Sequence, residues 1–281
     1  MKLLRHGPIG RERPGLVDAQ GSIRDLTGLL ADLTPDQLSP AGLRALAAVD
    51  ASRLPAVTPG TRIGVPIAGI RQFIGIGLNY RQHAMEAGMP IPAEPIVFSK
   101  SITALAGPDD DLPLPAGSVA LDYEVELGIV IGSTARRVTP AAALSHVAGY
   151  VLANDVSERD WQLQRGGQWM KGKCHDGFGP IGPWLVTTDE IPDPQAVALA
   201  LRVNGEVRQD SSSADMIFGV AEIVSYLSDF MTLLPGDVIV TGTPQGVGMG
   251  FKPPKYLKAG DVVELRSPQL GRQRQRVVPL G

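Results

Sequence analysis

The chain has 281 residues, of which 43% are hydrophobic and 20% charged, the composition of an ordinary globular protein. A formal net charge of −3 argues against nucleic acid or an anionic membrane as the main partner. A single cysteine excludes an internal disulfide and a cysteine zinc cage, and no segment approaches the length of a bilayer span. We therefore expect a cytoplasmic protein that binds neither nucleic acid nor membrane.

Residues 1–66 predict a small N-terminal α/β lobe. Short strand-like runs reach residue 30, with a hairpin tip at Ala19-Gln20-Gly21. Thr34 and Ser39 each precede a proline, the pattern of a helix N-cap followed by Pro at the first helical position. The Pro- and Gly-rich stretch 54–69 predicts a linker to a main domain over 67–281.

Strand-like runs dominate the main domain. They lie at 72–80, 94–100, 125–132, 148–155, 183–189, 199–205, 237–243 and 261–267. Two helices are predicted, around 140–147 and 220–233. Because strands and helices do not alternate regularly, a doubly wound sheet or a TIM barrel is disfavoured. We predict a mainly β fold with some α, an α+β architecture built as a mixed, mostly antiparallel β-roll or barrel.

Three acids in this domain are spaced for one divalent metal ion. Glu124 and Glu126 are two apart in a strand-like run, so with Asp122 they share one face. Asp155 ends a second apolar run, where a sheet presents functional groups. Like charges this close repel unless a cation lies between them. Oxygen ligands without a His–Cys cluster suit Mg²⁺, Mn²⁺ or Ca²⁺ better than zinc. A solvated sheet face is the alternative for the E-x-E pair alone.

A histidine and a glutamate follow the first strand of the main domain. His83 and Glu86 are three residues apart, so on a helical turn they share a face and can hydrogen-bond. A carboxylate beside an imidazole fixes its tautomer and raises its basicity, as a general base for water requires. The alternative is a surface pair on a loop.

Two further segments carry polar groups among glycines. Lys171 and Lys173 lie in GGQWMKGKCHDGFGPIGPW, where a lysine near a metal ion could bind a substrate carboxylate or an oxyanion. Cys174 and His175 invite a nucleophile interpretation that nothing else in the chain supports. The loop TGTPQGVG within 233–250 offers amides and hydroxyls to an anion and lacks the GKS/T of a Walker A loop.

Together these motifs resemble the fumarylacetoacetate hydrolase family. GLNYxxHAxE, the ExE strand, NDxSxRDxQ, GKxxDxFGPxGPW and TGTPxGVG occur in the family's order from about Gln72 to Glu264. The N-terminal lobe also looks like the small leading domain of the family. The resemblance implies a β-roll core, a homodimer, and a small-molecule 2-oxo acid as substrate.

The resemblance also assigns individual residues. Glu124, Glu126 and Asp155 match the ligands of one Mg²⁺ or Mn²⁺ per subunit, and His83 with Glu86 match a water-activating dyad on a lid. Lys173 falls at the position of a lysine that contacts an oxyanion. Contacts to substrate or water are implied at four further positions: Lys100, Arg159, Gln162 and Thr243. One departure is Gly177, where the family often has threonine.

The expected activity is metal-dependent hydrolysis of a carbon–carbon bond in an acylpyruvate, a 2,4-dioxo acid, with release of pyruvate. The GGQWxKGK context resembles the branch of 2,4-dioxo-3-deoxy sugar-acid hydrolases and proteins named ureidoglycolate lyase. Ureidoglycolate cleavage, 2-oxo acid decarboxylation and hydration are alternatives on the same fold. A binding protein that has lost catalysis is the alternative from a different class.

Overall fold

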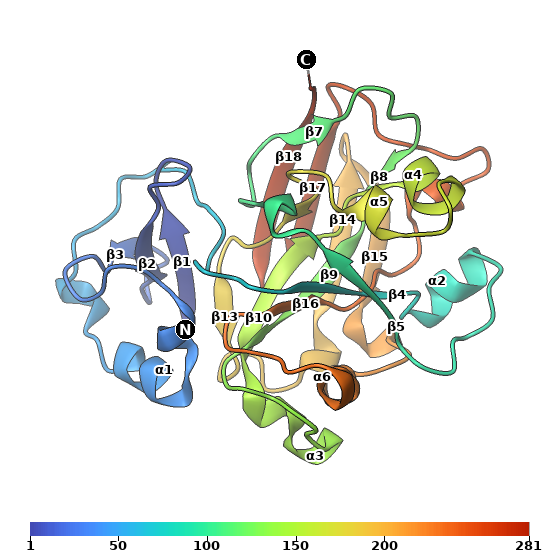
Figure 1. Ribbon diagram of the computed structural model, residues 1–281. Coiled ribbons are helices and arrows are strands. Elements are labelled where there is room, and N and C mark those ends of the chain that lie inside the picture. Colours follow the sequence, from blue (N-terminus) through green and yellow to red (C-terminus); the bar gives the residue numbers. More distant parts are fainter. Residues whose placement is uncertain (281) are drawn as a thin grey trace.

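The computed structural model describes residues 1–280, and the largest element within them is a nine-stranded sheet (Figure 1). In spatial order its strands are β3 (Ile23–Asp25), β2 (Arg13–Val17), β1 (Lys2–His6), β13 (Leu185–Thr187), β10 (Val147–Asn154), β9 (Val125–Ile131), β16 (Val238–Val240), β4 (Phe73–Gly77) and β5 (Ile96–Lys100). Neighbours run antiparallel except β16 and β4, which are parallel. Within the described residues the end strands β3 and β5 do not pair with each other, so the sheet is open.

A second sheet covers one face of the first. Its strands in spatial order are β15 (Glu206–Ser212), β14 (Ala198–Val203), β17 (Val262–Ser267), β18 (Gly271–Pro279) and β7 (Leu112–Leu114). Two short pairs complete the β-structure of the described residues: β11 (Ser157–Glu158) with β8 (Leu121–Asp122), and β12 (Gly179–Pro180) with β6 (Leu105–Ala106).

Helices are short and lie at the periphery. They are α1 (Pro40–Ala47), α2 (Arg81–Glu86), α3 (Pro140–Ala143), α4 (Arg159–Gln164), α5 (Met170–Lys173) and α6 (Val220–Phe230). Figure 1 shows α4 and α5 beside β8, with α3 and α6 at the opposite end of the β-structure. The expected mainly β fold with α is confirmed, and so are the helices predicted near 140 and 220. Within residues 1–280, no helix combines the length and apolarity that crossing a membrane requires.

Strands β9 and β10 are buried on both faces and separate two apolar cores. Leu127 and Leu152 point into the core beneath the five-stranded sheet and α6. Val130 and Val151 point into the other core, which includes apolar residues of the N-terminal segment. Double-sided burial explains why these two runs are almost continuously apolar in sequence.

The N-terminal segment continues the main sheet rather than standing apart from it. Leu3 of β1 pairs with Leu185 of β13. The predicted hairpin tip is confirmed, since β2 and β3 pair and Gly21 N donates to Asp18 O at 3.0 Å. Ser39 caps α1 by accepting from Gly42 N at 3.1 Å. The expected boundary between 1–66 and 67–281 stays a prediction.

The two longest strands outside the predicted set are β15 and β18, where glutamines occupy inward positions at which the alternation rule looks for apolar residues. Gln209, Gln273 and Gln275 are all buried. Their amides are hydrogen-bonded, for example Gln273 Nε2 to Leu152 O at 2.8 Å, so burial leaves them satisfied.

The close approach of β10 to β13 predicts a stability effect. A Cβ at Gly149 would lie 2.2 Å from Val186 O, so Gly149→Ala must push the strands apart. We expect the free energy of unfolding in urea to fall by about 1–3 kcal/mol. Gly28→Ala is the matched control, because nothing lies within 4 Å of its added Cβ. Equal stability of both variants would contradict this packing.

Candidate metal centre

Three carboxylates meet where β9 begins beside the end of β10. Glu124 precedes β9, Glu126 lies within it, and Asp155 follows β10. The antiparallel register places Val125 opposite Asn154, and Asp155 N donates to Glu124 O at 2.9 Å. One oxygen of each carboxylate lies within 4.8 Å of the others, and all three side chains are buried. The sheet register therefore assembles the acids that the sequence singles out.

Burial and charge drive the pKa values of two of these acids in opposite directions. Burial raises the pKa of Glu126 well above its usual range, and the charges of Asp155 and Glu124 raise it further. Burial acts on Glu124 as well, but Lys173 and Arg159 outweigh it and hold the pKa of Glu124 at about 2. Glu126 is thus the acid whose ionisation most needs another positive charge.

Three cationic side chains surround the acids. Lys173 Nζ lies 2.6 Å from Glu124 Oε2 and 2.7 Å from Asp155 Oδ2. Arg159 Nη2 lies 2.7 Å from Glu124 Oε1, and Lys100 Nζ contacts Asp155 Oδ1 at 2.5 Å. Burial lowers the pKa of Lys173, yet Asp155 and Glu124 outweigh it, so this pKa is raised and the ammonium stays charged.

The donor set fits a hard divalent cation. Glu126 forms no ion pair within the described residues, and one of its oxygens accepts only from Gly242 N at 2.7 Å. Each oxygen of Glu124 and Asp155 keeps a second lone pair beside its cationic partner. One oxygen of each acid lies within 4.8 Å of the others, so all three could contact a single ion. Glu124, Glu126 and Asp155 are therefore the residues that would hold a metal ion.

The three acids line a cavity of about 530 Å³, and the histidine–glutamate pair lines the same cavity. His83 Nδ1 is 3.0 Å from Glu86 Oε2, and Glu86 Oε1 accepts from Gly246 N at 2.9 Å. A Cβ at Gly250 would lie 2.4 Å from Glu86 Cδ, so glycine there makes room for the carboxylate. The carboxylate places the proton on Nδ1 and leaves Nε2 as the basic nitrogen.

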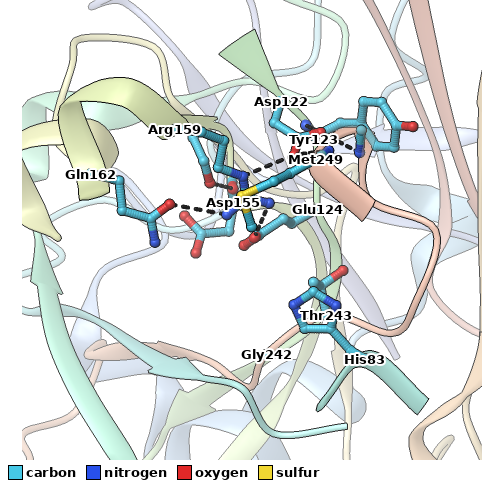
Figure 2. Close-up of polar contacts among 12 residues, drawn as sticks. His83, Asp122, Tyr123, Glu124, Asp155, Arg159, Gln162, Gly242, Thr243 and Met249 are labelled. Atoms are coloured by element: carbon cyan, nitrogen blue, oxygen red, sulfur yellow. Dashed lines mark hydrogen bonds and ion pairs between the residues drawn. The ribbon is translucent and has the colours of Figure 1, made fainter. Parts of the chain in front are cut away.

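Three of the predicted substrate contacts also line this cavity: Arg159, Gln162 and Thr243. Figure 2 shows Arg159 between Asp122 and Gln162, with Nε 2.8 Å from Asp122 Oδ2 and Nη1 3.0 Å from Gln162 Oε1. The hydroxyl of Thr243 donates to Val125 O at 3.0 Å. Their roles toward substrate stay predictions.

Lys100 differs from these three residues. It is fully buried behind Asp155 and does not line the cavity. This geometry favours a role in holding Asp155, and a direct substrate contact stays a prediction. Of the two lysines in the Gly-rich segment, Lys173 reaches the acids, whereas Lys171 is exposed and donates to Arg165 O.

Asp122 does not join the acidic face that alternation predicts. The strand is interrupted between β8 and β9, and Asp122 turns away to accept from Arg159 and from Gly248 N at 2.7 Å. The expectation that all three alternating acids share one face is therefore wrong for Asp122. It instead holds the arginine that neutralises Glu124.

The two unusual residues of the Gly-rich segment lie away from the cavity lining. Gly177 has a φ of +79° and packs against Pro113, a backbone conformation that disfavours threonine. The Sγ of Cys174 accepts from Ser101 N at 3.1 Å and is not part of the lining. Neither residue bears on substrate chemistry through direct contact.

Buried amides support the acids from behind, and sequence reasoning missed them. Asn154 Oδ1 accepts from Glu124 N at 3.1 Å, and its Nδ2 donates to Gln275 Oε1 at 3.1 Å. Gln209 accepts from Val125 N at 2.9 Å and donates to Thr243 Oγ1 at 2.8 Å. The sequence signal that could have identified these amides is a polar residue at an inward-facing position of a strand.

Solved structures with a similar fold include hydrolases and isomerases. Fumarylacetoacetate hydrolase from Exiguobacterium antarcticum is 39% identical, with a TM-score of 0.88 and full coverage of both chains. A Mycobacterium abscessus protein provisionally named 2-hydroxyhepta-2,4-diene-1,7-dioate isomerase is 36% identical, with a TM-score of 0.85 and the same coverage. Maleylpyruvate hydrolase from Sphingobium sp. SYK-6 is 29% identical, with a TM-score of 0.82 and full coverage of both chains.

Sequence comparison gives the family. The family model of the C-terminal domain of fumarylacetoacetate (FAA) hydrolase matches residues 72–278. A protein of Burkholderia ambifaria, named only provisionally as a hydrolase, is 57% identical over 276 residues that cover 98% of each chain. The chain belongs to the fumarylacetoacetate hydrolase family, and the resemblance drawn from its motifs is confirmed.

The charge balance predicts how a Glu126→Gln variant behaves. Affinity for Mn²⁺ and Mg²⁺, measured by titration calorimetry, should fall at least about 100-fold because one charged ligand is lost. Stability of the metal-free variant in urea should stay equal or rise, because burial disfavours the ionised acid at this position. Glu222→Gln, on the exposed side of α6, is the control and should change neither. Unchanged metal affinity in Glu126→Gln would remove this residue from the ligand set.

Proposed function

We propose that the protein is a divalent-metal-dependent hydrolase that cleaves a carbon–carbon bond in an acylpyruvate and releases pyruvate. The observation that carries this proposal is one cavity lined by Glu124, Glu126 and Asp155 together with the His83–Glu86 pair. A carboxylate triad suits Mg²⁺ or Mn²⁺, one per subunit, and a 2-oxo acid offers two oxygens to such an ion. The name of the similar Sphingobium enzyme, a maleylpyruvate hydrolase, supports the acylpyruvate class.

A bound metal ion would polarise the oxo group of the substrate and stabilise enolate charge. Within the protein, His83 Nε2 takes a proton from water, and Glu86 stabilises the resulting imidazolium through Nδ1. The hydroxide adds to the C4 carbonyl, the bond between C3 and C4 breaks, and its electron pair remains on the pyruvate enolate. Lys173, charged and buried beside the acids, stabilises that negative charge. The acyl carbon leaves as a carboxylic acid, and the proton that His83 took from water passes to C3 to give pyruvate.

Other activities are possible alternatives for this site. Isomerases, decarboxylases, hydratases and ureidoglycolate lyases need acid–base groups but no water that attacks a carbonyl. The oriented His83–Glu86 pair, fixed by Gly246 N, favours hydrolysis. A binding protein without catalysis is disfavoured because an oriented acid–base pair that lines the same cavity as the triad has no use in binding alone.

Two assignments beyond the site stay predictions. A homodimer follows from the family resemblance, and a cytoplasmic location follows from composition. Light scattering coupled to gel filtration measures the first directly.

Removal of the metal ion should stop turnover. With a panel of 2,4-dioxo acids, the metal-loaded protein should release pyruvate, as measured by coupled lactate dehydrogenase. EDTA should abolish release, and excess Mg²⁺ or Mn²⁺ should restore it. Release that persists after exhaustive chelation would exclude metal-dependent hydrolysis.

Loss of the imidazole should separate catalysis from metal binding. We expect His83→Ala to keep wild-type Mn²⁺ affinity and to lose about 10²–10⁴-fold in kcat, the usual contribution of a positioned general base. His146→Ala removes a histidine that contacts Ser133, outside the cavity lining, and should leave kcat near wild type. A near-normal kcat in His83→Ala would remove His83 from the mechanism.

A further inference from the structure

An aromatic wall stands beside the acids on one side of the cavity. Phe98 of β5 and Trp169 just before α5 have ring centroids 5.8 Å apart, inclined by 58°. Two glycines of β4 make room for these rings. A Cβ at Gly75 would lie 2.1 Å from Phe98 Cζ, and one at Gly77 would lie 2.2 Å from the Trp169 ring. The sequence G-I-G in β4 is thus the local cause of the wall.

The wall begins at the reacting end of the site. Lys173 Nζ lies 5.2 Å from the centroid of the Phe98 ring, while the same ammonium contacts Glu124 and Asp155. A group that extends from the acids past Lys173 therefore meets Phe98, whose ring lies against that of Trp169. In an acylpyruvate whose oxo-acid end faces the acids, that group is the acyl chain.

Much of the remaining lining is also apolar. It includes the side chains of Met89, Leu163, Met249 and Phe251. Such surfaces gain free energy from burying hydrocarbon and offer no hydrogen bonds to hydroxyl groups.

Few cationic side chains line the cavity. Within the described lining the cationic side chains are Arg159, Lys173 and Lys252. The first two already neutralise buried acids, and Lys252 is exposed. Arg208 and Lys255 stack on Phe251, and each forms an ion pair with Glu206. Nε and Nη1 of Arg208 are buried without a hydrogen-bond partner, but neither Arg208 nor Lys255 lines the cavity.

We infer that the acyl group of the substrate is uncharged and ends in hydrocarbon, with Phe98 and Trp169 as its specificity-determining contacts. This inference rests on the proposed function and adds the acyl class to it. A second carboxylate, as in the 1,7-dioate after which one similar structure is named, would lose its hydration without gaining a buried cation. The sugar-acid substrate expected from the sequence would likewise leave hydroxyl groups without partners on the wall.

The test compares acids of equal carbon number on the metal-loaded, full-length protein. 2,4-Dioxoheptanoate ends in a methyl group, 2,4-dioxoheptanedioate ends in a carboxylate, and 6,7-dihydroxy-2,4-dioxoheptanoate carries two hydroxyl groups. We expect kcat/KM for the heptanoate to exceed that for the dioate by about 100-fold or more, and to exceed that for the dihydroxy acid. A lead below tenfold over the dioate, or equal or better cleavage of the dihydroxy acid, would overturn the inference.

Trp169→Ala shows whether the wall causes the preference. In the wild type, kcat/KM for 2,4-dioxoheptanoate should exceed that for 2,4-dioxopentanoate by about 10-fold or more, because two methylene groups reach the wall. The variant should lose most of this ratio. Trp161→Ala is the matched control, since Trp161 contacts His175 and does not line the cavity, and it should keep the ratio. An unchanged ratio in folded Trp169→Ala would exclude Trp169 as a determinant.

The outcomes separate this inference from the proposed function. Preferred cleavage of the dioate, with that preference lost in Lys252→Ala, would assign the second carboxylate to Lys252 and overturn the inference while the hydrolase stands. No pyruvate from any of the four acids, despite calorimetric uptake of Mn²⁺, would overturn both.

Discussion

The buried charge cluster at the junction of β9 and β10 is the constraint on which the rest of the site depends. Three carboxylates in an apolar interior would each cost several kcal/mol if left unpaired. Their cationic partners come from three separate elements: Lys100 ends β5, Arg159 begins α4, and Lys173 ends α5. The charges therefore fix where these peripheral elements lie relative to the central strands. The shortage of positive charge at Glu126 leaves a place for a metal ion.

Much of the fold and site could be predicted because strand alternation and local spacing carry the information. Glu124, Glu126 and Asp155 were recognisable since each interrupts or ends an apolar run, and His83 with Glu86 since three-residue spacing matches a helical turn. The broken strand that turns Asp122 toward Arg159 was not predictable, because it depends on tertiary partners such as Gly248 N. The position of Lys100 behind its acid was hidden for the same reason.

Strand β4 shows how two glycines can shape a site. The glycines are visible in the sequence, but the sequence does not show which side chains pack over them. Phe98 comes from the neighbouring strand and Trp169 from a segment nearly a hundred residues later in the chain. The rings of Phe98 and Trp169 thus cover the glycine backbone of β4 and form an apolar surface there. This surface lies next to the buried charge cluster.

Hydrogen bonds between amide groups link β18 to the acids. Gln275 of β18 bonds to Asn154, which lies 121 residues earlier in the sequence, and Asn154 bonds to the backbone of Glu124. A ribosome makes all three carboxylates well before it makes β18. At ordinary synthesis rates of about 5–20 residues per second, that interval is roughly 6 to 24 s. During it the acids lack the scaffold that orients Glu124, so the three carboxylates reach their final arrangement only after β18 has been made.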